Sequence, residues 1–118
     1  MSKPTILYVD DDNENIILFK ILFKSSFEIL TAASGNEGLE ILSENKHIKA
    51  IISDMKMPGM DGLKFLAAAK HINDVPCFLL TGFEEIDGGI EEGLLAGKFN
   101  KPFDTEKILS SLKKVMLN

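Results

Sequence analysis

The chain has 118 residues, of which 45% are hydrophobic, so it is long enough to bury one compact core and too short for two. It carries 18 acidic residues against 13 lysines and no arginine, and its net charge of −5 gives no general attraction to nucleic acid. No apolar run approaches the roughly 18 residues of a membrane span, and no basic segment followed by a long apolar region opens the chain. We therefore expect one soluble, cytoplasmic domain over residues 1–118 that binds neither nucleic acid nor membrane.

The first half of the chain alternates between strand-like and helix-like patterns. An apolar, β-branched run over Thr5–Val9 predicts a strand that ends in the acidic triplet Asp10–Asp12. From Asn13 apolar residues recur at helical spacing, which predicts a first helix. Residues 27–33 predict a second strand, and residues 34–45 predict a second helix. The apolar side chains expected to anchor the first helix are Ile17, Leu18, Ile21 and Leu22.

A third strand and its loop follow. The run Ala50–Asp54 is apolar until its last residues, ends in a carboxylate and breaks at once into the Pro58–Gly62 loop. Short apolar runs bounded by turn residues are typical of buried parallel strands. This pattern predicts a strand that delivers Asp54 to a sheet edge, and a third helix then runs from Leu63 to the stop at Asn73–Pro76.

The last third of the chain contains two predicted strands separated by a glycine-rich segment. Cys77–Thr81 predicts a fourth strand and Lys98–Asn100 a fifth, and Asp104 is the expected N-cap of a last helix. The segment between these strands should form only a short, weak helix, because each glycine costs up to about 1 kcal/mol in a helix interior. Its glycines are Gly82, Gly88, Gly89, Gly93 and Gly97. Five strands alternating with five helices predict a doubly wound parallel α/β sheet with helices on both faces.

The ends of these strands carry the candidate chemistry. Asp10, Asp11, Asp54, Thr81 and Lys101 each follow or end a predicted strand. Because ligands of open α/β sheets bind beyond the carboxyl ends of the strands, these side chains are expected to converge on one edge. Carboxylates this close repel one another unless a cation lies among them, and hard oxygen ligands suit Mg²⁺. A carboxylate, a cation, an ammonium and a hydroxyl together suit phosphoryl transfer, with Asp54 as the expected phosphoacceptor.

Four motifs in combination resemble the receiver domains of two-component response regulators over essentially the whole chain. They are Val9-Asp10-Asp11, the segment Asp54–Gly62, the pair Thr81-Gly82 and the triplet Lys101-Pro102-Phe103. The resemblance implies a flavodoxin-like (βα)5 fold with strand order 2-1-3-4-5 and a cis Lys101–Pro102 peptide. It also implies that a sensor histidine kinase or phosphotransfer protein phosphorylates this chain, which then acts on a downstream protein target.

The resemblance also implies a role for each site residue. Asp54 would accept the phosphoryl group, and Thr81 and Lys101 would contact its oxygens. Asp11 and Asp54 would bind Mg²⁺, or alternatively Mn²⁺, directly together with the backbone carbonyl of Lys56. Asp10 would act on the ion largely through water. Such a protein catalyses its own phosphorylation and dephosphorylation without being a conventional turnover enzyme.

One position departs from the family pattern. Receivers usually carry Tyr or Phe three residues before the last-strand lysine, and this chain has Lys98 there. Phe99 is adjacent, but successive strand residues point to opposite faces, so it cannot take the same place. We therefore expect activation to be carried by backbone movement of residues 82–97. The expected output face combines this segment with the last strand and the last helix.

A receiver-like interaction module that is not phosphorylated is the alternative interpretation. Its mark would be the loss of acidic or lysine positions at the strand ends, and all of them are present. The chain ends at Asn118, directly after the last predicted helix. A stand-alone regulator that works through protein contacts is the simplest expectation, although a piece of a longer protein would have the same sequence.

Overall fold

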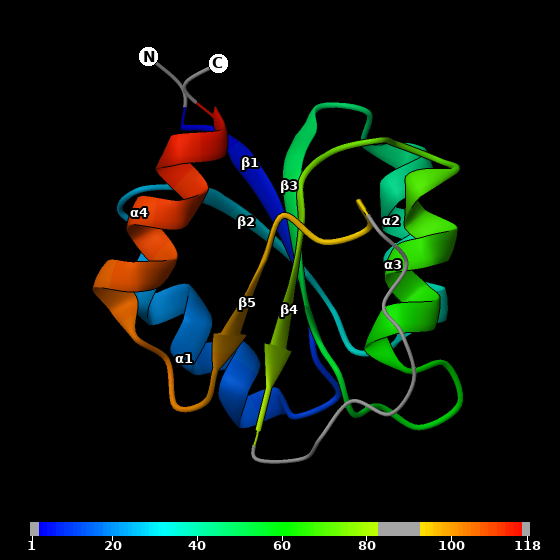
Figure 1. Cartoon of the computed structure of the whole chain (residues 1–118), viewed down its shortest axis with the longest axis horizontal. Coiled ribbons are helices and arrows are strands. Elements are labelled where there is room, and N and C mark those ends of the chain that lie inside the picture. Colours follow the sequence, from blue (N-terminus) through cyan, green and yellow to red (C-terminus); the bar gives the residue numbers. More distant parts are fainter. Residues whose placement is uncertain (1–2, 83–92, 117–118) are drawn as a thin grey trace.

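The computed structural model describes residues 3–82 and 93–116, and its five strands form one parallel sheet in the order β2-β1-β3-β4-β5 (Figure 1). The predicted strand order is therefore confirmed. The strands are β1 (Thr5–Val9), β2 (Glu28–Ala32), β3 (Ile48–Asp54), β4 (Cys77–Thr81) and β5 (Gly97–Asn100). The helices are α1 (Asn13–Phe23), α2 (Gly35–Glu44), α3 (Gly62–Lys70) and α4 (Thr105–Met116). The weak helix predicted between the last two strands falls mainly on residues 83–92, outside the described residues.

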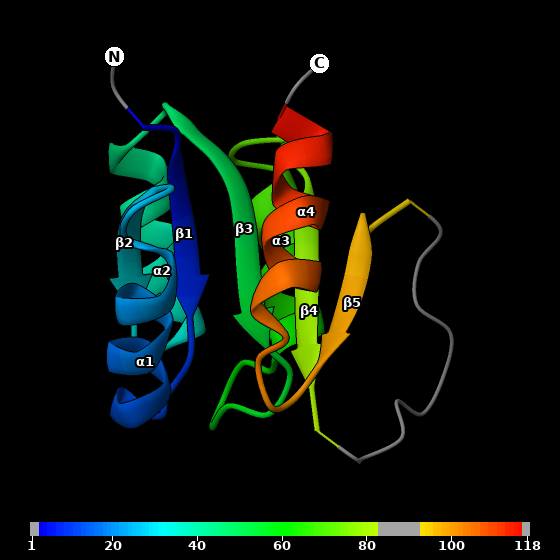
Figure 2. The ribbon, with the colours of Figure 1, turned by 90° about the vertical axis from the view of Figure 1, so that its left-hand side faces the viewer.

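Helices cover both faces of the sheet, as predicted for a doubly wound fold. Helices α2 and α3 lie on one face, and α1 and α4 lie on the other (Figures 1 and 2). Each face has its own apolar cluster, the first around Leu7, Ile51 and Phe65 and the second around Tyr8 and Phe19. Since the sheet is buried on both faces, the central strands are apolar at nearly every position rather than alternating.

All five strands point the same way, so their carboxyl ends meet at one edge of the sheet (Figure 2). Val9 pairs in register with Ser53. Asp54 pairs with Leu80, and Thr81 pairs with Asn100. The parallel register therefore brings the polar residues that follow these strands to the same end of the molecule.

Side-chain caps fix where the helices begin. The carboxylates of Asp12 and Asp61 accept hydrogen bonds from backbone N–H groups in the first turns of α1 and α3, each at 2.9 Å. Ser34 caps α2 in the same way at 3.1 Å. Asp104 accepts from the backbone N–H of Lys107 at 3.1 Å, which confirms the predicted cap of the last helix. Within the described residues, no helix has both the length and the apolar character needed to cross a membrane.

The first helix packs on a different face from the one expected. Its buried side chains are Phe19 and Phe23, and of the four residues expected to anchor it only Leu22 packs against the core. The other three are 50%, 45% and 60% exposed, so the expectation for them was wrong. Because this helix is apolar on more than one side, the larger aromatic rings determine which side faces the sheet. The exposed side chains are Ile17, Leu18 and Ile21.

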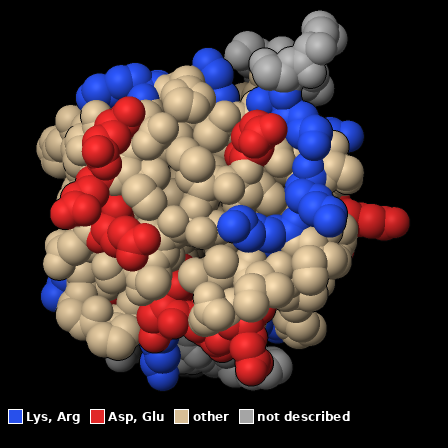
Figure 3. Space-filling view, turned by 180° about the vertical axis from the view of Figure 1, so that it is seen from behind, with Lys and Arg blue, Asp and Glu red and all other residues tan. Residues whose placement is uncertain are grey.

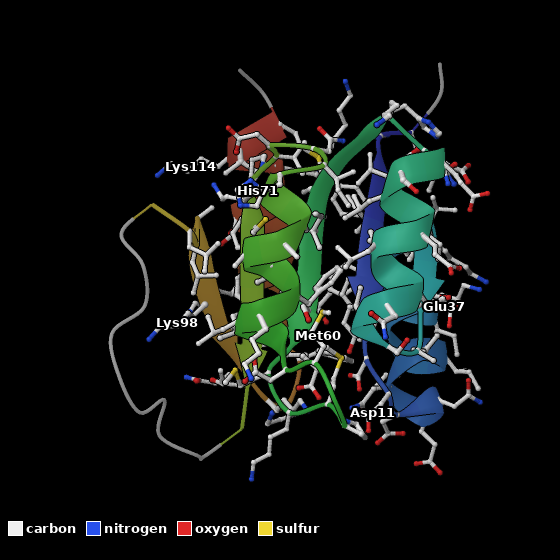
Figure 4. All side chains as sticks on the ribbon, turned by 90° about the vertical axis from the view of Figure 1, so that its right-hand side faces the viewer. Asp11, Glu37, Met60, His71, Lys98 and Lys114 are labelled. Atoms are coloured by element: carbon white, nitrogen blue, oxygen red, sulfur yellow. The ribbon has the colours of Figure 1, made fainter. Side chains whose placement is uncertain are left out.

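The last strand confirms the predicted opposition of Lys98 and Phe99. Phe99 is buried and stacks on Phe78 with ring centroids 5.2 Å apart. Lys98 is exposed and projects from β5 on the side that carries α3 (Figure 4). No aromatic side chain therefore occupies the position at which receivers usually carry Tyr or Phe.

Candidate functional site

Three carboxylates meet at the carboxyl edge of the sheet, as the strand ends predicted. Asp10 follows β1 and is fully buried, Asp54 is the last residue of β3 and is 3% exposed, and Asp11 is exposed. One carboxylate oxygen from each lies within 4.8 Å of the others. Figure 4 shows Asp11 at the end of the molecule where the strands finish. The three residues form one acidic pocket with a buried floor and an open rim.

Asp10 is held by three hydrogen-bond donors. The Tyr8 hydroxyl donates to its Oδ2 at 2.6 Å, and the Asn15 side-chain amide donates to the same oxygen at 3.2 Å. The backbone N–H of Asp12 donates to Oδ1 at 2.9 Å. Burial, followed by the hydrogen bond to Asp10, raises the pKa of Tyr8 far above its ordinary value. The phenol therefore stays protonated and acts as a donor.

Among the described residues, Asp54 forms one ion pair. The Lys101 ammonium lies 2.7 Å from its Oδ1, and about a third of the lysine side chain remains exposed. This contact is an ion pair, and apart from it Asp54 Oδ1 is a buried oxygen without a hydrogen-bond donor among the described residues. Burial is the largest influence on Asp54 and raises its pKa, while Lys101 lowers it and the charges of Asp10 and Asp11 raise it. The ionised form of Asp54 is thus disfavoured in the metal-free protein.

Thr81 is the last residue of β4, and Lys101 directly follows the neighbouring strand β5 at the same edge of the sheet. The backbone N–H of Lys101 donates to the carbonyl of Thr81 at 2.8 Å, which ties the ends of β4 and β5 together. The buried Thr81 hydroxyl donates to Asn100 Oδ1 at a long 3.4 Å. A contact between Thr81 and a phosphoryl group stays a prediction. The peptide between Lys101 and Pro102 is cis, as the resemblance implied.

The loop after Asp54 folds back tightly against the strand. The backbone N–H of Gly62 donates to the carbonyl of Met55 at 2.8 Å. A Cβ at Gly62 would lie 2.3 Å from the Asp54 carbonyl oxygen, so this close approach requires glycine. An open hollow of about 470 Å³ beside the loop is lined by Met55, Lys56, Met57, Pro58 and Asp61. Lys56 belongs to this loop, two residues after Asp54, and a role for its carbonyl stays a prediction.

The pocket fits a hard divalent cation. All its candidate ligands are carboxylate oxygens, and apart from its ion pair with Lys101 the buried Asp54 Oδ1 has no hydrogen-bond donor within the described part of the chain. Acidic side chains also gather on the surface at the end of the molecule where the strands finish, whereas most lysines of this face lie elsewhere (Figure 3). Oxygen ligands with room for water are what Mg²⁺ prefers. A cation here would reduce the repulsion among the three carboxylates and would give Asp54 Oδ1 a further partner.

The comparison with known families agrees with this geometry. The family model of the response regulator receiver domain matches residues 6–113. The chain belongs to this family. Receivers accept a phosphoryl group in a reaction that generally depends on Mg²⁺, and they interact with histidine kinases or phosphotransfer proteins and with downstream effectors.

Two curated relatives show how much of a protein this receiver matches. It is 32% identical over 121 residues to sporulation initiation phosphotransferase F of Bacillus subtilis, covering 98% of this chain and 96% of the relative. It is 33% identical over 121 residues to the transcriptional regulatory protein PrrA of Mycobacterium tuberculosis, covering 98% of this chain and 51% of the relative. The receiver therefore spans nearly the whole of one relative and about half of the other.

Solved structures show the same architecture. A response regulator receiver domain protein from Clostridium thermocellum superposes with a TM-score of 0.89 at 29% identity, covering 99% of this receiver and 95% of that chain. The Vibrio cholerae chemotaxis protein CheY4 superposes with a TM-score of 0.84 at 28% identity, covering 98% and 100%. The fold of this receiver is therefore that of CheY-like proteins.

The sequence did not point to three polar residues that touch the site residues. Tyr8 was part of an apolar strand, Asn15 was one polar residue of a helix, and Asn100 was the end of a short strand. The available signal was the two-residue period of a strand, which places Tyr8 on the same side as Asp10. No comparable signal marked Asn15 or Asn100 in this receiver, because their contacts depend on how α1 and β5 sit beside the strand ends.

Proposed function

We propose that residues 1–118 form a phosphoacceptor receiver domain in which Asp54 accepts a phosphoryl group from the phosphohistidine of a sensor histidine kinase or phosphotransfer protein. The observation that carries the proposal is the position of Asp54 on the floor of the acidic pocket with the Lys101 ammonium 2.7 Å away. The Asp54 carboxylate can act as the nucleophile, and the Lys101 ammonium beside it can stabilise the negative charge of the phosphoryl oxygens.

The reaction exchanges one bond at phosphorus for another. A carboxylate oxygen of Asp54 attacks the phosphorus in line, an O–P bond forms, and the N–P bond of the donor breaks. The imidazole of the donor keeps the electron pair of the broken bond and takes up a proton. The Lys101 ammonium supports the charge on the phosphoryl oxygens, and the Thr81 hydroxyl is proposed to donate to one of them.

The proposed cation site uses the acidic pocket. Asp11 and Asp54 are proposed to bind Mg²⁺, or Mn²⁺, together with the Lys56 carbonyl, while Asp10 acts through water. When bound, the ion neutralises the carboxylates and the charge on the transferring phosphoryl group. The donor set of oxygens and the poorly satisfied Asp54 Oδ1 support this assignment.

The exposed apolar side chains of α1 support a docking place for the protein donor. Leu18 lines an open hollow of about 330 Å³ together with Asn15, Lys101, Pro102 and Phe103. Ile17 and Ile21 continue this surface, since residues three and four apart in a helix are neighbours. A phosphohistidine surface that covers this apolar patch would bring its phosphoryl group beside Lys101 and Asp54.

The proposed output face lies at the edge of the sheet formed by β5. It comprises β5 and α4, with the segment from residue 82 to 97 as the element that reorganises. The exposed Lys98 and the absence of an aromatic side chain at its position support a change carried by the backbone. The target is proposed to be another protein, because the net charge of −5 does not favour nucleic acid.

Phosphorylation is tested with acetyl phosphate and Mg²⁺. The wild-type chain should gain one phosphoryl group by intact mass, and Asp54→Asn should gain none. Asp61→Asn is the matched control, because Asp61 caps α3 in the same loop and should leave phosphorylation intact. A wild-type chain that stays unmodified would favour the alternative of a receiver-like interaction module without phosphorylation.

A further inference from the structure

Tyr8 is a fully buried phenol whose hydroxyl points at the acidic pocket. Its ring stacks on Phe19 with centroids 4.1 Å apart and an angle of 5°, and it meets the edge of Phe103 at 6.1 Å. The ring therefore belongs to the apolar cluster beneath α1 and α4. A buried tyrosine hydroxyl needs a hydrogen-bond partner, and here the partner is Asp10.

Within the part of the chain that the structure describes, the hydrogen bonds of Asp10 leave one lone-pair direction open. Each carboxylate oxygen has about two lone-pair sites. Oδ2 accepts from both the Tyr8 hydroxyl and the Asn15 amide, so its sites are filled. Oδ1 accepts from the backbone N–H of Asp12 and retains one site. Asp10 can therefore offer the pocket a single lone-pair direction, on Oδ1.

We propose that Tyr8 is a positioning residue of the cation site: its hydroxyl, with Asn15, fixes the Asp10 carboxylate so that only Oδ1 serves the ion or its water. This inference rests on the proposed cation site. The 2.6 Å bond from Tyr8 is shorter than the 3.2 Å bond from Asn15, so Tyr8 contributes more of the constraint. Without the hydroxyl, the carboxylate can rotate and its charge beside Asp11 and Asp54 loses a stabilising donor.

Tyr8→Phe separates the hydroxyl from the ring. It keeps the stacking on Phe19 and removes only the donor. Mg²⁺ affinity measured by calorimetry should fall about tenfold, as is usual when a hydrogen-bond partner of a metal ligand is lost. Asn15→Ala should weaken binding less. The Mg²⁺ concentration that gives half-maximal phosphorylation by acetyl phosphate should rise by a similar factor, because the effect lies in binding of the ion.

Phe103→Leu is the matched control for packing. It removes the ring edge that meets Tyr8 but keeps the hydroxyl, so it should lower the melting temperature while leaving Mg²⁺ affinity unchanged. A second readout is available because the chain has one tyrosine and no tryptophan. A carboxylate that accepts a hydrogen bond from a phenol quenches tyrosine fluorescence. The fluorescence of Tyr8 should therefore rise when Mg²⁺ binds, because the ion weakens Asp10 as a hydrogen-bond acceptor. The Mg²⁺ concentration at half of the fluorescence rise should match the dissociation constant from calorimetry, and the rise should disappear in Asp10→Asn.

The outcomes separate this inference from the proposed function. If Tyr8→Phe binds Mg²⁺ as tightly as wild type, the positioning role of Tyr8 is wrong while the cation site stands. If Phe103→Leu weakens binding as much as Tyr8→Phe, packing rather than the hydroxyl is responsible and the inference fails. A wild-type chain without measurable Mg²⁺ affinity would overturn the proposed cation site and this inference together.

Discussion

Asp54 is the residue at which function opposes stability. Its carboxylate is buried, faces two other carboxylates and has one lysine as counter-charge. Burial dominates and raises the pKa of Asp54 in spite of Lys101. A carboxyl group whose pKa is higher in the folded state binds its proton more tightly there. The metal-free protein therefore gains stability when Asp54 is protonated, and this gain is lost as pH rises through the folded-state pKa.

The neutral variant Asp54→Asn should be more stable than wild type in EDTA at pH 7. Its advantage should shrink as pH falls, because wild-type Asp54 then becomes protonated and equally neutral. We expect a difference of a few degrees in melting temperature, since about 1 kcal/mol moves a domain of this size by roughly 4 °C. Scanning calorimetry between pH 4 and pH 8 measures it. A wild type that is the more stable protein at pH 7 would show that the Lys101 ion pair outweighs burial and repulsion.

The acidic residues and the lysine of the site could be predicted from the sequence, because parallel strands must end at one edge. Their partners could not. Tyr8 was one apolar-run residue among five, and nothing in the sequence states whether its hydroxyl meets a carboxylate or a backbone carbonyl. Asn15 reaches Asp10 only because Asp12 caps α1 and sets the angle at which the helix leaves the strand. Hydrogen bonds between elements depend on such placements, which local patterns do not encode.

At the scale of elements, α1 shows how a helix can be predicted while its orientation is not. Its start at Asn13 was predicted from the apolar spacing, but apolar side chains occur on more than one side of the helix. Phe19 and Phe23 face the sheet because Tyr8 offers a flat ring for stacking, and smaller isoleucines are left outside. The exposed patch is therefore a consequence of packing in the core beneath it, which periodicity alone cannot rank.

The double variant Ile17→Ser with Ile21→Ser tests the docking role of this patch. Each exposed isoleucine that a partner covers is worth about 1 kcal/mol, so transfer from a phosphohistidine-carrying protein should slow by roughly tenfold or more. Phosphorylation by acetyl phosphate should be unchanged, because it needs no docking surface. Lys113→Ser on the exposed surface of α4 is the control for a surface change elsewhere. If phosphorylation by the protein donor and by acetyl phosphate slowed equally, the double variant would have damaged the phosphorylation site rather than a docking surface.

The loop between β3 and α3 offers a second test at this scale. Gly62→Ala brings a Cβ to 2.3 Å from the Asp54 carbonyl oxygen, so the strand end or the helix must move. Gly59→Ala meets no atom within 4 Å, but its φ of +77° strains an L-residue. We expect Gly59→Ala to cost about 1 kcal/mol and Gly62→Ala at least twice that, measured by urea unfolding. Equal costs would mean that the backbone at Gly62 relaxes freely.

At the scale of the whole molecule, the two faces of the sheet are anchored by separate apolar clusters while the site lies at their common end. The fold was predictable because pattern, caps and turns agree along the described chain. Residues 83–92 carry the predicted weak helix and lie outside the described residues, so the expected reorganisation on activation stays a prediction.

In EDTA we expect Asp54→Asn to be more stable than wild type, and a cation that binds only the folded state should reverse this order. A ligand at about 100 times its dissociation constant stabilises the folded state by roughly 2.7 kcal/mol. Wild type in excess Mg²⁺ should therefore gain several degrees in melting temperature over its value in EDTA, whereas Asp54→Asn, which lacks one proposed ligand, should gain little. Asp74→Asn serves as the matched control, because Asp74 pairs with Lys70 at the exposed end of α3 and should gain as much as wild type. Each comparison is made at equal ionic strength, so that general screening of the net charge of −5 is the same in both buffers. Equal gains in wild type and Asp54→Asn would show that Mg²⁺ acts by screening or at another place, and Asp54 would then not be a ligand.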